Sequence, residues 1–100
     1  MIIEFEAELW LWTARRGDSW TFVSLPTEAS EEIRELTAGA QRGFGSVRVR
    51  VRLGTTSWTT SIFPDSGRSC YVLPIKRAVR VAEQLAEGDR VAATVELIES

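Results

Sequence analysis

The sequence predicts a mainly β fold with two short helices, closed into a barrel with pseudo-twofold symmetry. Within residues 46–63, positions 47–53 alternate between aliphatic and arginine residues and positions 58–63 are rich in β-branched and aromatic residues, which is typical of strands. The order strand, Leu-Pro, helix, strand also occurs twice, with its Leu-Pro pair beginning at Leu25 and again at Leu73. Two such units are too few for a solenoid, but each can pair the strand edges of the other. We therefore expect one barrel domain over residues 1–100.

The centre of the chain is expected to form a hairpin. Its first strand carries aliphatic side chains on one face and guanidinium groups on the other, with Val47, Val49, Val51 and Leu53 alternating with Arg48, Arg50 and Arg52. Residues 54–57 supply a polar connection that starts with a glycine. A second run, rich in β-branched and aromatic residues, follows from Trp58 and is expected to stop at Pro64.

Four further strands are expected. We expect them at residues 2–12, 20–25, 69–73 and 89–98, the first two forming a hairpin. Strand 2–12 should point Ile3, Phe5, Ala7, Leu9 and Leu11 to one face and Glu4, Glu6, Glu8, Trp10 and Trp12 to the other.

Two segments have helical spacing. The first is expected to be capped by Thr27, to stop near Gly39 and to place Ala29, Ile33 and Leu36 inward. The second is expected over residues 76–86, closed by Gly88, with Val79, Ala82, Leu85 and Ala86 inward. Leu25, Val49, Leu73 and Val95 should then share one core.

The composition excludes several classes of protein. Hydrophobic residues make up 44% and charged residues 26% of the chain, close to globular averages. The apolar runs are too short for a spanning helix, and the first residues lack a leader pattern, so we expect a cytoplasmic location. With Cys70 as the only cysteine and no histidine, neither an internal disulfide nor an ordinary zinc site is expected.

The sequence predicts binding rather than catalysis. Cys70 has no histidine to activate it, and no other catalytic constellation or cofactor motif is present. The expected ligand site consists of Trp58, Tyr71, Lys76 and Arg80. Lys76 and Arg80 lie one helical turn apart, where they can hold an anion together with the N–H groups of the helix start. The expected partner is a small anionic ligand or a protein; a solvated helix face is the alternative.

The arginine strand suggests a second function. Arg48, Arg50 and Arg52 are spaced about 7 Å apart along a strand, and this spacing suits contacts to nucleic-acid phosphates. The alternative is a charge ladder with Glu4, Glu6 and Glu8, provided that the two strands are neighbours. The net charge of −2 disfavours nucleic acid as the main partner.

Exposed aromatic residues are a further candidate. Trp10 and Trp12 fall on the polar face of their strand, where they can stack on bases or cover an apolar ligand. The alternatives are packing beneath a neighbouring helix or loop, and a surface for a partner or a weak homodimer.

Much of the chain resembles a small prokaryotic domain-of-unknown-function family. The resemblance lies in residues 5–9, 20–26, 47–54, 58–64, 71–76, 79–80 and 88–91, most specifically in Trp58 to Pro64 and Leu73 to Val91. Longer relatives join this domain to a YdeI/OmpD-associated, or bacteriocin-protection, segment. The resemblance implies a double-split β-barrel, the fold class of the AbrB and MazE transcription factors. Those proteins build the barrel from two chains, whereas this family holds both halves in one. It implies no established activity.

Overall fold

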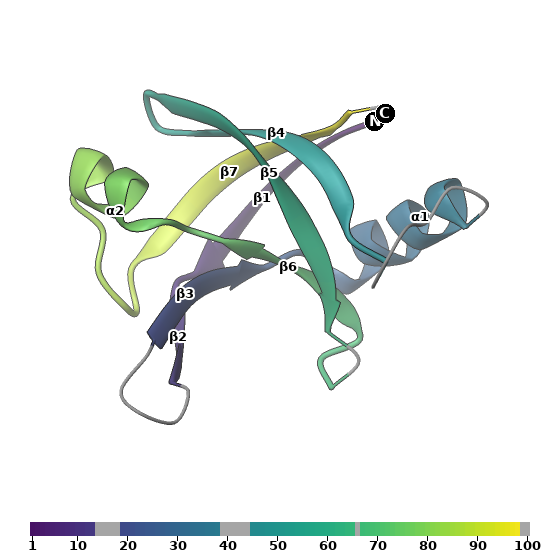
Figure 1. The fold of residues 1–100 in the computed structure, drawn as a ribbon, viewed down its shortest axis with the longest axis horizontal. Coiled ribbons are helices and arrows are strands. Elements are labelled where there is room, and N and C mark those ends of the chain that lie inside the picture. The colour runs from purple at the N-terminus through teal and green to yellow at the C-terminus, as the bar shows by residue number, and fades with distance from the viewer. Residues whose placement is uncertain (14–18, 39–44, 66, 99–100) are drawn as a thin grey trace.

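A computed structural model describes residues 1–13, 19–38, 45–65 and 67–98 of the chain. Within these ranges, seven strands form a curled antiparallel sheet, a half-barrel, with two helices at its ends (Figure 1). The strands are β1 (Ile2–Glu8), β2 (Trp10–Thr13), β3 (Ser19–Ser24), β4 (Val47–Leu53), β5 (Thr56–Asp65), β6 (Cys70–Pro74) and β7 (Arg90–Leu97), and the helices are α1 (Thr27–Thr37) and α2 (Arg77–Glu83). The predicted mainly β class with two short helices is confirmed.

The first thirteen residues supply both edge strands of the sheet, β1 and β2. The strand order is β1-β7-β4-β5-β6-β3-β2. β1 pairs with β7, and after Leu9 the chain changes partner, so that β2 pairs with β3. At the change, the Leu9 N–H donates to the Asp89 carbonyl and the Leu9 carbonyl accepts from the Gly88 N–H, both at 2.9 Å. The prediction of one unbroken strand over residues 2–12 was therefore wrong. Leu11, expected inside, is 41% exposed.

The order strand, Leu-Pro, helix, strand occurs in two units, β3-α1-β4 and β6-α2-β7, which pair with each other through two registers. In each register one residue lies opposite the residue at the corresponding position of the other unit: Ser24 opposite Val72 between β3 and β6, and Val51 opposite Val95 between β4 and β7. The pairs that flank Val51 and Val95 exchange places when the two units are exchanged, since Val49 lies opposite Leu97 and Leu53 opposite Ala93.

The core lies inside the curl and is lined by residues from every strand except β2. Strand β4 alternates between buried and exposed positions along its whole length, as predicted. Leu25, Val49, Leu73 and Val95 are each at most 2% exposed and belong to the same cluster, so their predicted common core is confirmed.

Strand β5 continues through Pro64, which was expected to end it. Its residues up to Ile62 pair with β4, whereas Phe63 to Asp65 pair with β6. Pro64 therefore stands where the strand has just left its first partner. A missing N–H is tolerated at such a position, because one side of the strand has no ladder to complete.

Helix α1 contacts the sheet through a narrow stripe. Ser30 and Ile33 are buried, and the Ser30 hydroxyl oxygen accepts a hydrogen bond from the Tyr71 N–H at 3.0 Å. Leu36, expected inside, is 65% exposed because it lies beyond this contact. Pro26 holds the N-cap position in place of Thr27, without a side-chain cap, and Gly39 lies outside the described residues.

Helix α2 is shorter than predicted because Gln84, with a left-handed φ of 55°, takes the role expected of Gly88. Val79 is buried, but Ala82 and Ala86 are exposed. The Glu83 carboxylate accepts hydrogen bonds from the hydroxyl groups of Thr56 at 2.6 Å and Thr55 at 3.2 Å. These bonds fasten α2 to the β4–β5 turn. The Thr56 hydroxyl, followed by Thr55, holds the pKa of Glu83 below its ordinary value against the opposing effect of burial.

Candidate functional site

The outward side chains of β2, β3 and β5 form an aromatic face. We use this name for Trp10, Trp12, Trp20, Phe22 and Phe63. Residues directly opposite one another on antiparallel strands point to the same side of the sheet, and the register places Trp10 opposite Phe22 and Trp12 opposite Trp20. Trp12 and Trp20 are 51% and 56% exposed, and Phe63 is 42% exposed. Large aromatic surface is therefore open to solvent on this side.

The rings of the aromatic face form a short stack. The centroids of Trp20 and Phe22 lie 6.4 Å apart with an interplanar angle of 15°. Those of Phe22 and Trp10 lie 5.0 Å apart at 33°. These separations are within the range in which aromatic pairs attract each other. The stack therefore supports its own members and holds Trp20 in place.

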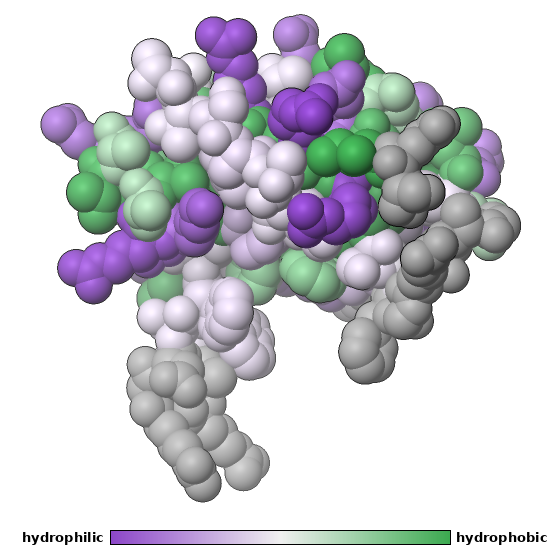
Figure 2. Space-filling view, turned by 45° about the horizontal axis from the view of Figure 1, so that its top comes forward, coloured by the Kyte–Doolittle hydropathy of each residue, from purple (hydrophilic) through white to green (hydrophobic). Residues whose placement is uncertain are grey.

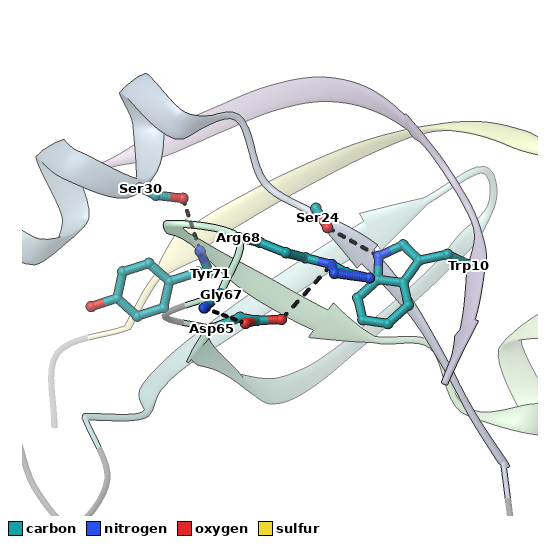
Figure 3. A network of polar contacts seen from close by, with 7 residues as sticks. All are labelled: Trp10, Ser24, Ser30, Asp65, Gly67, Arg68 and Tyr71. Atoms are coloured by element: carbon teal, nitrogen blue, oxygen red, sulfur yellow. Dashed lines mark hydrogen bonds and ion pairs between the residues drawn. The ribbon is translucent and has the colours of Figure 1, made fainter. Parts of the chain in front are cut away.

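Polar contacts fix the inner end of the stack (Figure 3). The Trp10 Nε1 donates to the Ser24 hydroxyl at 3.0 Å, and the Arg68 guanidinium lies 3.9 Å from the Trp10 ring centroid. Asp65 orients Arg68 through an ion pair at 3.8 Å, and its other oxygen accepts the Gly67 N–H at 3.0 Å. The indole of Trp10 is thereby held between a hydrogen bond and a cation–π contact. Arg68 was not singled out from the sequence.

The outer side of β1, β7 and β4 is charged. We call this side the charged face; its outward charged residues are Glu4, Glu6, Glu8, Arg48, Arg50, Arg52, Arg90 and Glu96. Arg50 pairs with Glu96 at 3.0 Å, and Arg90 with Glu6 at 3.3 Å. The glutamate and arginine strands are not neighbours, because β7 lies between them. The proposed direct ladder between them is therefore wrong, and the two ion pairs described run through β7.

The four residues of the expected ligand site lie in different environments. Tyr71 is 1% exposed and belongs to the core. Trp58 is half-buried and packs against the core from β5. Lys76 is exposed, whereas Arg80 donates from Nη1 to the Ile75 carbonyl at the start of its own helix. The tyrosine ring therefore offers almost no surface to a ligand in this conformation, and the site remains a prediction.

The α2 end of the molecule, at the left of Figure 2, shows hydrophobic side chains beside strongly hydrophilic ones. Val81 is 67% exposed there, and Lys76 and Arg77 are exposed as well. Elsewhere in this view the strongly hydrophilic side chains form separate groups rather than one continuous strip (Figure 2). This end therefore presents a mixed surface.

The structure also bears on metal binding, on the single cysteine and on membrane-spanning helices. Among the described residues, no three His, Cys, Asp or Glu side chains come together in a way that suits a metal ion. Cys70 is buried. No helix in the described ranges is long and apolar enough to cross a membrane. A cytoplasmic location remains a prediction.

Comparison with protein families gives a match over residues 5–95 to the model named "Domain of unknown function (DUF1905)". The chain belongs to the DUF1905 family. The expected resemblance to a domain-of-unknown-function family is confirmed to this extent. No curated protein matches the sequence of this DUF1905 chain.

Proposed function

We propose that this domain is an interaction module that binds another protein through its aromatic face. The observation that carries the proposal is the pair formed by Trp12 and Trp20, which lie opposite each other and are each more than half exposed. Full burial of an aromatic side chain removes roughly 150 to 250 Å² from water, and a partner would cover the half of Trp12 and of Trp20 that is still exposed. Tryptophan, phenylalanine and arginine are also enriched at protein interfaces.

The rings of the aromatic face are ordered by specific contacts, as expected for residues at the centre of a protein interface. Trp10 is held by Ser24 and Arg68, and Phe22 lies between Trp10 and Trp20. Such ordering lowers the entropy cost of binding, because the rings are already near a single arrangement. Arg68 and Asp65 compensate each other's charge, so the surface favours a largely apolar partner segment.

Binding can be tested with a double variant that removes the exposed pair. We expect Trp12→Ala/Trp20→Ala to fold normally and to lose, by about tenfold or more, the affinity for any protein that the parent domain binds. Partners would be captured from an extract of the source cells with the immobilised domain, then purified and titrated by calorimetry.

A matched control removes exposed apolar groups elsewhere. Leu36 and Val81 are 65% and 67% exposed on α1 and α2, outside the aromatic face. Leu36→Ala/Val81→Ala should retain the partner. Equal affinity of the tryptophan variant and the parent domain for every captured protein would refute the proposal. Sedimentation of both variants shows whether the partner is a second copy of the chain.

Nucleic-acid binding is the second candidate, because Arg48, Arg50 and Arg52 are all exposed on one side of β4. The pairing of Arg50 with Glu96 weakens its case. Labelled duplex and single-stranded oligonucleotides titrated at low and moderate salt would test it. Salt-sensitive binding that is lost on changing all three arginines to alanine would favour this function. Absence of binding at low salt would leave them as surface charges.

We further propose that the half-barrel is a single-chain double-split β-barrel of the AbrB and MazE class. The support is the symmetry of the two registers, centred on Ser24 with Val72 and on Val51 with Val95. Each half of the sheet takes one strand from each repeated unit, as a pseudo-twofold axis requires. An experimental structure whose two units do not superpose would contradict this assignment.

A further inference from the structure

An open hollow of about 480 Å³ lies on the charged face, above the middle of β7. Its floor consists of small residues, Ala92 and Thr94, while the neighbouring strands contribute long charged side chains. Glu4 and Glu6 line it from β1, Arg52 from β4 and Arg90 from β7 itself. The hollow exists because the strand between two rows of long side chains carries short ones.

The charges around the hollow are only partly matched. Arg90 and Glu6 form an ion pair at 3.3 Å. Glu4 and Arg52 make no ion pair within the described residues. Both lie opposite Thr94 in the sheet registers, one on each side of it. Two strand spacings separate their backbones, which is about 9 to 10 Å.

This arrangement suits a molecule with two opposite charges at a distance from each other. An ammonium group can pair with the Glu4 carboxylate, and a carboxylate can accept both N–H groups of the Arg52 guanidinium fork. Free glycine is too short to reach both charges. A peptide gains about 3.3 to 3.6 Å per extended residue, so two or three residues are enough once the side chains lean inward.

We infer that the hollow binds the two termini of a short zwitterionic peptide, with its amine at Glu4 and its carboxylate at Arg52. The Thr94 and Ala92 floor lets the peptide backbone lie close to β7. This site is separate from the aromatic face, and its occupancy does not depend on a protein partner there.

A titration with small peptides tests the inference. Gly-Gly and Gly-Gly-Gly would be added to the ¹⁵N-labelled domain at low ionic strength, and the amide signals of Ala92, Ala93 and Thr94 followed by NMR. We expect saturable shifts with these peptides, and an affinity about 1.4- to fivefold lower for N-acetyl-Gly-Gly and for Gly-Gly amide, each of which lacks one terminal charge.

Variants identify the charges responsible. Glu4→Gln and Arg52→Gln should each weaken binding by about 1.4- to fivefold, the range for exposed charge pairs. Glu8→Gln and Arg48→Gln, on the same two strands but outside the lining of the hollow, should leave the affinity unchanged. Absence of shifts, equal affinity for the blocked peptides, or equal losses in the control variants would each overturn the inference.

Discussion

The aromatic face and the charged face lie on two halves of one curled sheet and cover one core, but their outer side chains differ in kind. The charged half exposes arginine and glutamate, and two ion pairs join its strands. The other half exposes tryptophans that solvent does not favour. Since the inner residues of both halves already supply the core, folding does not require an aromatic exterior. This difference is the reason why we propose a binding role for the aromatic half.

The helices are fastened to the two halves in different ways. Ser30 of α1 bonds the backbone of β6 in a buried, uncharged contact. Glu83 of α2 bonds the β4–β5 turn through a carboxylate at the surface. One attachment should therefore be insensitive to pH, whereas the other should depend on it.

The largest expected effect tests whether the two halves share one core. Leu73→Ala in the aromatic half should cost about 2 to 5 kcal/mol, and Val49→Ala in the charged half about 1 to 3 kcal/mol, because both side chains are fully buried. Urea unfolding followed by tryptophan fluorescence and by circular dichroism should give one coincident transition for each variant. Separate transitions, or a near-neutral Val49→Ala, would contradict the common core.

Ser30→Ala is expected to cost about 1 to 3 kcal/mol, because it leaves the buried Tyr71 N–H without its acceptor. The loss should be the same at pH 3 and pH 6, since neither partner titrates in this range. Ser30→Thr, which keeps a hydroxyl group, provides the comparison. A loss that changes with pH would show that α1 is held by charges not identified in this contact.

Glu83→Gln should have a smaller effect that depends on pH. The pKa of Glu83 is lowered in the folded state, so its contribution to stability is present above the unfolded pKa of about 4.3 and disappears as the pH falls through the folded value. The urea midpoints of the parent and the variant should therefore differ at pH 6 and converge toward pH 3. A difference that persists unchanged in acid would contradict the attachment of α2 through this carboxylate.

The smallest effect is expected for the pair of Arg50 and Glu96. Both side chains are well exposed, so a double-mutant cycle with alanine should give a coupling free energy of about 0 to 1 kcal/mol that shrinks as salt is added. A larger coupling that resists salt would mean that the charged face is more than a solvated surface.

The sequence predicted the parts of the fold that depend on local alternation. Every residue of β4 lies on its expected side, and Leu25, Val49, Leu73 and Val95 share one core as expected. The change of partner after Leu9 was missed, because the alternation of apolar and polar residues continues across it. Leu36 and Ala82 were misplaced because helical spacing shows which residues share a side, not how far the sheet extends beneath them.

The candidate site was predictable only in part. Alternation placed Trp10 and Trp12 on the outer side of their strand, and the structure shows that Trp12 stays exposed there. The contact between Arg68 and Trp10 was not predictable, because it joins residues that meet only when β2, β3 and β6 are side by side. The Trp20 to Phe22 stack likewise needed the register of β2 with β3.

The strands β1 and β2 are adjacent in sequence but lie at opposite edges of the sheet, and this affects the order in which the chain folds during translation. Strand β1 is synthesised first, but its partner β7 follows 82 residues later, from Glu8 to Arg90. At about 5 to 20 residues per second, the ribosome needs roughly 4 to 16 s to make the intervening chain. The β4–β5 hairpin can form during that interval, whereas β1 must wait with its apolar side uncovered. Joining the two termini and opening the chain at the Gly54–Thr55 turn would make β1 and β7 neighbours in sequence but would move β4 and β5 to opposite ends of the chain, so the delay would pass to the β4–β5 pairing.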